Sequence, residues 1–206
     1  MKEKMCIDSA SPDPSTGSGS ALSKVERADN ERMLEYKKLA IAFSYPDDSF
    51  FAFFPQISQE PEALRLEYDR LFRSSEVWLY GSEHTAENEF QRAQNLADIN
   101  GFYRAFGLEP DKDRPDALSC ELEFMHYLIF KKLHALKDKN KPGNRAKAST
   151  CLGAEKKFFS EHLYPAAKSI ARKITSQAKD GFYLAASQEL LKFLEAEEEG
   201  LFKKDR

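Results

Sequence analysis

The sequence predicts an all-α, single-domain bundle of roughly seven to ten helices. The β-branched residues Val, Ile and Thr are scarce, whereas Leu, Ala, Glu, Lys and Arg are abundant, and this balance favours helices over sheets. Apolar residues recur at intervals of three and four along most of the chain, and no segment alternates with the period of two that indicates a strand. With 206 residues, of which 41% are hydrophobic, the chain can bury a substantial core.

The N-terminal part differs in composition from the rest. Residues 1–28 are rich in Ser, Pro, Gly and Asp and poor in large apolar side chains, so they cannot offset the entropy of ordering and are predicted to be a flexible tail. Residues 29–206 are predicted to form the helical domain. Its first helix has Asp29 or Asn30 available as a cap and stops before Pro46.

Two further helices are predicted before the centre of the chain. In the segment EPEALRLEYDRLF, Leu64, Tyr68, Leu71 and Phe72 fall on one face. The irregular segment that follows it carries Trp78, the only tryptophan, and Tyr80, and these rings either dock on the core or face a partner.

The segment ENEFQRAQNLADINGFYRAFG, residues 87–107, is predicted to be a long helix that Gly107 terminates. Gly101 within it costs about 1 kcal/mol relative to alanine, which suggests close packing at that position. In the connection that follows, Asp116 is positioned to cap the next helix.

The segment LSCELEFMHYLIFKKLHAL, residues 118–136, is apolar around most of the helical cylinder. Six apolar side chains share one face: Leu118, Leu122, Met125, Ile129, Leu133 and Leu136. Three aromatic side chains extend the apolar surface: Phe124, Tyr127 and Phe130. Such a helix is either the buried centre of a bundle or the wall of a groove that receives another molecule's apolar segment.

The C-terminal part begins with a polar, Gly-Pro-interrupted stretch near residues 137–150, which is predicted to be a mobile linker within the domain. Two more periodic segments follow, at residues 155–175 and 181–202. The first of them is expected to be interrupted at Pro165, whose ring removes an amide donor.

Composition excludes several classes of protein. The 31 basic and 34 acidic side chains are interspersed and give a net charge of -3, so no strong field attracts nucleic acid or an anionic membrane. The three cysteines are too scattered for a disulfide framework or a zinc site. No apolar run is long enough to span a membrane, and no apolar run follows the first lysines as in a secretory signal. We therefore expect a cytoplasmic protein without stable membrane insertion.

Few residues indicate catalysis. Glu123 and His126 form Glu-x-x-His, the spacing by which helical bundles hold paired metal ions, but that site needs a second such pair and the sequence has none. Phosphate-binding glycine loops and hydrolase or protease motifs are also absent from the sequence. We expect no catalytic residues, no metal site and no cofactor, and a helical metal-binding enzyme that uses Glu123 and His126 is the alternative.

Two acidic residues at the start of the central helix have two interpretations. Asp116 and Glu121 either complement the positive helix N-terminus or bring negative charge to the rim of an apolar groove. On the helical projection, Glu121 lies with Met125 and Leu128 near the apolar side. A ligand with basic residues next to an apolar stretch suits the second interpretation.

Three stretches resemble, in order and spacing, the TorD/DmsD/NarJ family of cytoplasmic chaperones: EYDRLF at 67–72, FYRAFGLEPDKDRPDALSCELEFM at 102–125 and FFSEHLYPAAKSIARKITSQAKDGFY at 158–183. The likeness extends from about residue 33 to residue 194. It implies an all-helical chaperone, not an enzyme, that assists the maturation of molybdenum-cofactor oxidoreductases of the dimethyl sulfoxide reductase class. Its implied partner is the apo catalytic subunit or that subunit's twin-arginine signal peptide.

The resemblance implies peptide-binding residues on the matching positions. Together with the two rings of the irregular segment they are Tyr68, Leu71, Phe72, Trp78, Tyr80, Asp116, Glu121, Glu123 and Phe124. The chain departs from the family pattern at Ala117, where relatives usually have His, and at Arg73, where they usually have Gly. The oligomer is expected to be a monomer or a segment-exchanged dimer, and an adaptor that uses its apolar surface for self-association is a further hypothesis.

Overall fold

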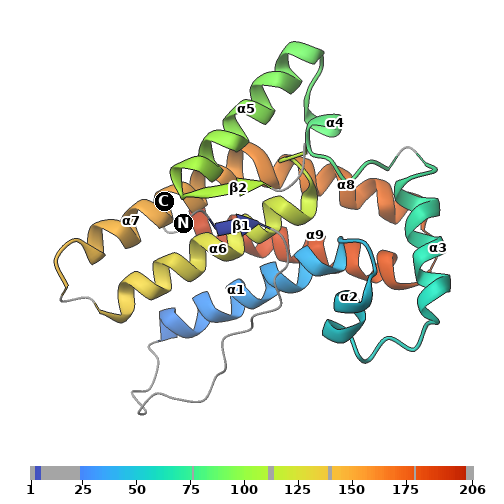
Figure 1. Ribbon diagram of the computed structural model, residues 1–206, viewed down its shortest axis with the longest axis horizontal. Coiled ribbons are helices and arrows are strands. Elements are labelled where there is room, and N and C mark those ends of the chain that lie inside the picture. The colour runs from blue at the N-terminus through green and yellow to red at the C-terminus, as the bar shows by residue number, and fades with distance from the viewer. Residues whose placement is uncertain are drawn as a thin grey trace.

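A computed structural model describes residues 3–5, 24–75, 77–110, 114–138, 141–178 and 180–202. These residues form nine α-helices, one π-helical turn and two short strands (Figure 1). The helices are α1 (Lys24–Ala42), α2 (Asp48–Phe53), α3 (Pro61–Phe72), α4 (Ser82–Thr85), α5 (Glu89–Ala105), α6 (Leu118–Lys137), α7 (Asn144–Phe158), the π-helical turn η1 (Phe159–Leu163), α8 (Tyr164–Gln177) and α9 (Phe182–Phe202). The predicted all-α class is confirmed.

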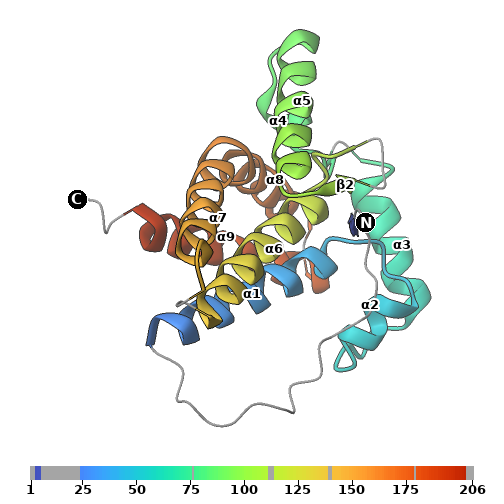
Figure 2. The ribbon, with the colours of Figure 1, turned by 60° about the vertical axis from the view of Figure 1, so that its left-hand side comes forward.

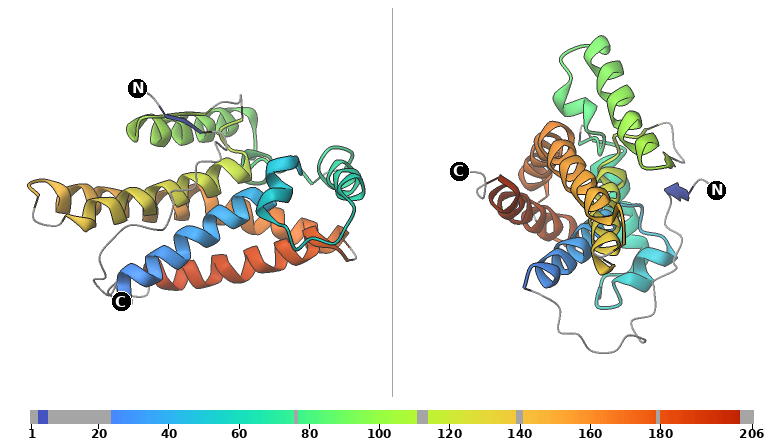
Figure 3. Two further views of the ribbon diagram at one scale, coloured as in Figure 1. Left: turned by 60° about the horizontal axis from the view of Figure 1, so that its bottom comes forward. Right: turned by 90° about the vertical axis from the view of Figure 1, so that its left-hand side faces the viewer.

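Helix α6 is the centre of the bundle. It packs against α1 and α7, and Figure 3 (left) shows α1 lying between α6 and α9. Leu122, Met125 and Ile129 are completely buried, so the apolar face that the sequence predicts is filled by neighbouring helices. The aromatic extension is only partly buried, because Phe130 is 42% exposed and stacks on His134.

A buried network of charged side chains links α1, α6, α7 and α9. It consists of Asp29, Arg32, Lys132, Glu155 and Glu197. Lys132 donates hydrogen bonds of 3.0 Å to both Asp29 and Glu155, and Arg32 donates to Glu197 at 2.6 and 2.7 Å. Arg32 also pairs with Glu155 and Asp29. Because each charge has a partner, the four helices can bury these groups together.

The first helix begins earlier than predicted. Helix α1 starts at Lys24, so Asp29 and Asn30 lie within it and neither caps it. Of the predicted tail, residues 1–28, the structure describes Glu3–Met5 and the first residues of α1, and the other positions lie outside the described residues. The flexibility of the tail stays a prediction.

The predicted linker near 137–150 is shorter in the structure. Helix α6 ends at Lys137 and α7 begins at Asn144, because residues 144–150 continue directly into the helical segment behind them. Residues 139–140 lie outside the described part. The mobility of this connection stays a prediction.

Helices α7 and α8 are continuous through η1, without the break that was expected at Pro165. The proline lies in the first turn of α8, but because η1 precedes α8 without a break, its missing amide donor falls inside a helical run. The five residues before α8 form the wider π turn η1, and such turns occur where the regular hydrogen-bond pattern of an α-helix is interrupted. Phe159 and Leu163 of this turn are buried in the core.

Two strands of three residues each were not predicted. β1 (Glu3–Met5) pairs in parallel with β2 (Leu108–Pro110), and Tyr80 forms an isolated antiparallel bridge with Ala117. Strands this short leave no alternation to detect in the sequence.

Helix α5 stands away from the bundle over much of its length (Figure 2). Its buried residues are Ile99 and Tyr103, near its C-terminal end, whereas Phe90 at the other end is 72% exposed. Gly107 has φ of +77° and ends the helix as predicted. The close packing expected at Gly101 is wrong, because an added Cβ there would meet nothing within 4 Å.

Candidate functional site

Three of the nine predicted peptide-binding residues belong to the core. Leu71 and Phe124 are completely buried and Phe72 is 5% exposed. Phe72 contacts Tyr68 edge to face, with ring centroids 4.9 Å apart. These three side chains therefore pack in the core, beneath the surface residues.

Four other predicted residues reach the surface. Trp78 is 44% exposed, and Tyr68, Tyr80 and Glu123 are partly exposed. They come from α3, from the connection between α3 and α4, and from α6, which are separate segments of the sequence. The carboxylate of Glu123 is already paired with Lys37, at 2.9 Å.

Asp116 is completely buried just before α6. Its carboxylate accepts hydrogen bonds from the Ser82 amide at 3.0 Å and from Arg114 at 3.0 and 3.2 Å. Burial alone would raise the pKa of Asp116, but the hydrogen bonds from Arg114 and Ser82 outweigh it and lower the pKa. The prediction that Asp116 caps α6 is wrong, because Ala117 is the N-cap and no side chain bonds the first amides.

Glu121 is 1% exposed and lies beneath the segment that joins α3 to α4. One of its carboxylate oxygens has no hydrogen-bond partner among the described residues. The Gly81 backbone covers it so closely that an added Cβ would lie 3.3 Å from the other oxygen. Burial, and then the charge of Asp116, raise the pKa of Glu121 well above its usual value.

The expectation that Asp116 and Glu121 lie on the rim of a groove is therefore wrong, since both are buried. The raised pKa of Glu121 favours its neutral form, which complements a helix N-terminus less well than a carboxylate does. The hydrogen bonds Gly81 N to Asp116 O at 2.7 Å and Leu118 N to Leu79 O at 2.8 Å hold the covering segment in place. Contact of these two acids with a peptide stays a prediction, and it requires this segment to open.

The first surface cluster surrounds Tyr68. Its ring contacts Tyr45 edge to face at 5.3 Å, and the Arg73 guanidinium lies 4.7 Å from the Tyr45 ring centroid and 5.7 Å from that of Tyr68. Arg73 also pairs with Asp69 at 2.8 Å. Aromatic rings and a carboxylate thus contact one guanidinium group.

The second surface cluster surrounds Tyr80. The Arg114 guanidinium lies 3.8 Å from the Tyr80 ring centroid and pairs with Asp116 and, at 3.2 Å, with Glu83. Glu83 also accepts a hydrogen bond from Arg92 of α5. This cluster repeats the composition of the first, with a tyrosine face, an arginine and carboxylates.

The ring of Trp78 is exposed, whereas its backbone carbonyl is hydrogen-bonded to His84. His84 Nε2 lies 2.7 Å from the Trp78 carbonyl oxygen, and His84 Nδ1 lies 3.3 Å from Ser169 Oγ of α8. Burial lowers the pKa of His84, although the hydrogen bond to Trp78 opposes this effect. His84 thus connects the surface tryptophan to α8.

Glu123 and His126 do not converge on a shared position. Glu123 pairs with Lys37, and His126 Nδ1 lies 2.9 Å from the Met33 carbonyl oxygen. Burial lowers the pKa of His126. Both side chains connect α6 to α1, and this arrangement removes the observation on which the metal-enzyme alternative depended.

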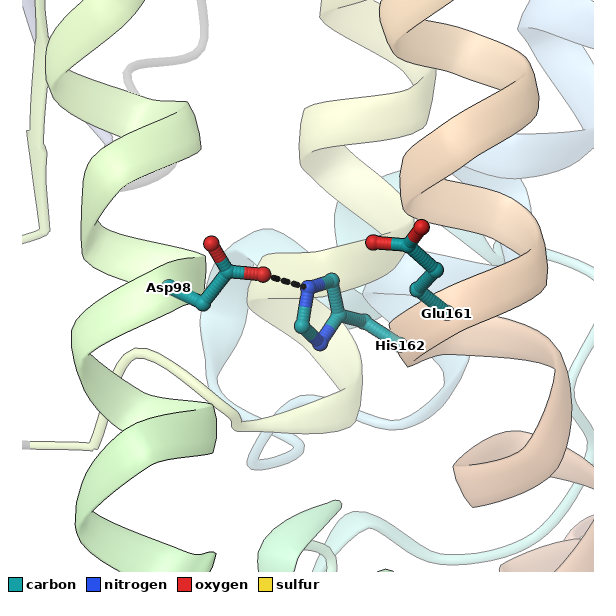
Figure 4. Close-up of side chains that lie close together, drawn as sticks. All are labelled: Asp98, Glu161 and His162. Atoms are coloured by element: carbon teal, nitrogen blue, oxygen red, sulfur yellow. Dashed lines mark hydrogen bonds and ion pairs between the residues drawn. The ribbon is translucent and has the colours of Figure 1, made fainter.

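Asp98, Glu161 and His162 lie together between α5 and η1, with ligand-type atoms within 4.8 Å of one another (Figure 4). His162 Nε2 is 2.8 Å from Asp98 Oδ2, and Glu161 pairs with Lys157 at 3.7 Å. Each carboxylate therefore already has a cationic or imidazole partner. The group connects α5 to the bundle.

Sequence reasoning missed Tyr45, Arg114 and Asp69, and it noted Arg73 only as a departure from the family pattern. In both surface clusters, an arginine lies close to tyrosine and acidic residues in the folded chain. The only helical spacing in the sequence that indicates such a pair is the separation of four between Asp69 and Arg73.

The structure also shows that none of the helices among its described residues is long and apolar enough to cross a bilayer.

Comparison with known proteins identifies the family. The sequence profile described as nitrate reductase delta subunit matches residues 48–170, more than half of the chain. The perchlorate reductase assembly chaperone protein of Dechloromonas aromatica (strain RCB) is 28% identical over 128 residues, which cover 60% of this chain and 54% of that protein. The chain thus spans about half the length of the curated relative it matches. The chain belongs to the nitrate reductase delta subunit family, in agreement with its resemblance to TorD, DmsD and NarJ proteins.

Proposed function

We propose that this chain is a cytoplasmic chaperone for the maturation of a molybdenum-cofactor oxidoreductase of the dimethyl sulfoxide reductase class. It binds the apo catalytic subunit, its twin-arginine signal peptide, or both. The observation that carries the proposal is the family match over residues 48–170, together with a relative named as an assembly chaperone.

The surface chemistry supports a cationic and apolar ligand. Tyr68, Tyr80 and Trp78 offer aromatic area, and Asp69 and Glu83 offer carboxylates next to two of these rings. Carboxylates bind guanidinium groups through paired hydrogen bonds, and aromatic faces cover both guanidinium and apolar side chains. A segment with arginines followed by an apolar run fits this combination.

Binding of this kind needs no covalent step and no cofactor. Micromolar affinity corresponds to about 8 kcal/mol, which one or two charge-assisted pairs and a modest apolar contact can supply while still permitting release. We therefore propose that the chain is not an enzyme. It acts as a monomer or as a segment-exchanged dimer.

Co-expression tests the proposal. The chain is produced with a molybdoenzyme catalytic subunit of the dimethyl sulfoxide reductase class from the same organism, either intact or without its N-terminal signal segment, in cells unable to make the cofactor. We expect the apo subunit to co-purify with the chain, and to do so more weakly without the segment. The proposal is wrong if neither the apo subunit nor its isolated signal segment binds.

A further inference from the structure

Two arginines of the chain lie on tyrosine rings at the surface. The Arg73 guanidinium is 4.7 Å from the ring centroid of Tyr45 and 5.7 Å from that of Tyr68. The Arg114 guanidinium is 3.8 Å from the ring centroid of Tyr80. These distances are within the range of cation–π attraction.

Each of these guanidinium groups also has a carboxylate. Arg73 pairs with Asp69 at 2.8 Å. Arg114 pairs with Asp116 through two nitrogens, at 3.0 and 3.2 Å, and with Glu83 at 3.2 Å. A tyrosine face combined with a carboxylate is a complete binding site for a guanidinium, whichever chain supplies it.

Tyr45 also borders a surface hollow. The hollow has a volume of about 480 Å³ and is lined by Tyr45, Asp47, Asp48, Ser49 and Arg65, and Arg65 pairs with Asp48 at 3.6 Å. A peptide whose arginine lies on the Tyr45 ring can therefore place a neighbouring residue in this hollow.

Arg73 does not satisfy all the hydrogen-bonding groups around it. Its side chain is 59% exposed, and its 2.8 Å contact with Asp69 is not aligned as a hydrogen bond, so Asp69 Oδ1 is buried without a hydrogen-bond partner among the described residues. The buried hydroxyl of Tyr183, whose ring lies 6.0 Å from that of Tyr68, has the same deficiency. Buried groups left in this way favour a better-placed donor.

We propose that Arg73 is the internal occupant of a guanidinium site formed by Tyr45, Tyr68 and Asp69, and that an arginine of a cargo segment binds by displacing it. The inference rests on the proposed function for the identity of the ligand. The site itself rests on the tyrosine, arginine and carboxylate geometry. Displacement makes binding weaker than it would be at an empty site. The site prefers arginine over lysine, because a lysine ammonium cannot stack and pair as a planar guanidinium does.

The test is a calorimetric titration of the full chain and of its Arg73→Ala variant with a peptide that carries consecutive arginines before an apolar run. We expect the variant to bind about five-fold more tightly, since it no longer loses its own cation–π and ion-pair contacts on binding. Arg73 is largely exposed, so the fold should tolerate the change. Equal or weaker binding by the variant would overturn the inference.

Arg70→Ala is the matched control. Arg70 is an exposed residue in the last turn of α3, Arg73 follows directly after that helix, and replacing Arg70 removes the same charge. If the two variants gain affinity equally, the effect is general electrostatics and the inference is wrong. The expected result is a gain in Arg73→Ala that clearly exceeds the gain in Arg70→Ala.

A second measurement separates the site from the cargo. Arginine amide or lysine amide is added to the Arg73→Ala variant, and the tyrosine ring signals are followed by NMR. Selective shifts of Tyr45 and Tyr68 with arginine amide support the site even if no cargo peptide binds, in which case only the proposed function fails. If these rings respond equally to both amides, or to neither, the inference is wrong.

Discussion

At the scale of single residues, Glu121 combines burial with an unpartnered carboxylate oxygen. The acid lies under Gly81 and next to Asp116, and no ion pair joins it to a cation among the residues that the structure describes. Keeping a proton is the least costly state for such a group. Glu121 therefore makes the stability of the chain depend on pH.

Glu121→Gln should gain stability relative to the unmodified chain as pH rises. The folded chain has a raised pKa at Glu121 and keeps a proton that the unfolded chain loses above about pH 4.3, so stability falls between that pH and the folded pKa. Glutamine has no such proton, and the advantage of the variant should reach at least about 1 kcal/mol at pH 8. Urea unfolding at pH 5 and pH 8 measures it.

Glu123→Gln provides the comparison for this experiment. Glu123 is on the same helix, but its carboxylate is partly exposed and pairs with Lys37. This variant should gain no stability between the two pH values. A Glu121→Gln variant that also gains none would show that the acid is ionised in the folded chain.

Gly81→Ala should destabilise the chain by about 1–3 kcal/mol, because an added Cβ would lie 3.1 Å from the Ala166 Cβ and 3.3 Å from Glu121 Oε1. Gly101→Ala should instead stabilise by about 0.5–1 kcal/mol, since the added Cβ meets nothing and the helix gains propensity. Thermal unfolding compares the two. Effects of the same sign would contradict the account of how closely the covering segment packs.

At the scale of helices, the buried charged side chains link α1, α6, α7 and α9. Lys132 of α6 is 6% exposed and holds Asp29 of α1 and Glu155 of α7. Burial alone would lower the pKa of Arg32, but hydrogen bonds and charges from Glu197 and Glu155 raise it, so this cation stays charged inside the network.

Lys132→Ala should destabilise the chain by about 3–5 kcal/mol, because the three acids Asp29, Glu155 and Glu197 would then share Arg32 as their single cation. Lys131→Ala on the same helix removes an exposed charge and should change stability by less than about 0.5 kcal/mol. Chemical denaturation of both variants tests this difference. A loss of less than about 1 kcal/mol in Lys132→Ala would show that the network contributes little.

At the scale of the whole molecule, the predictable features are those that depend on local periodicity. The buried face of α6 follows from residues three and four apart, and Glu121 could be placed beside Met125 and Leu128 on the same grounds. The partners of Arg32 lie on α7 and α9, and the rings around Arg73 come from two different elements. Such pairs form only when distant segments meet, so no spacing in the sequence indicates them.

The same distinction applies to the candidate site. Trp78 and Tyr80 lie in an irregular segment, and the sequence left open whether they dock on the core or face a partner. The structure leaves Trp78 44% exposed and Tyr80 partly exposed. Asp116 was assigned as a cap by its position alone, whereas the folded chain directs its carboxylate to Ser82 and Arg114. Side-chain direction depends on which tertiary partner competes for the group.

The central claim is that this fold binds an arginine-bearing segment of another polypeptide. Its most direct test is titration of the unmodified chain with the twin-arginine signal peptide of a molybdoenzyme catalytic subunit from the same organism and with the same peptide carrying two lysines in place of two arginines. We predict saturable binding of the arginine peptide, at least about ten-fold tighter than that of the lysine peptide, a difference of about 1.4 kcal/mol. Equal affinity for the two peptides, or no binding of either, would contradict the claim.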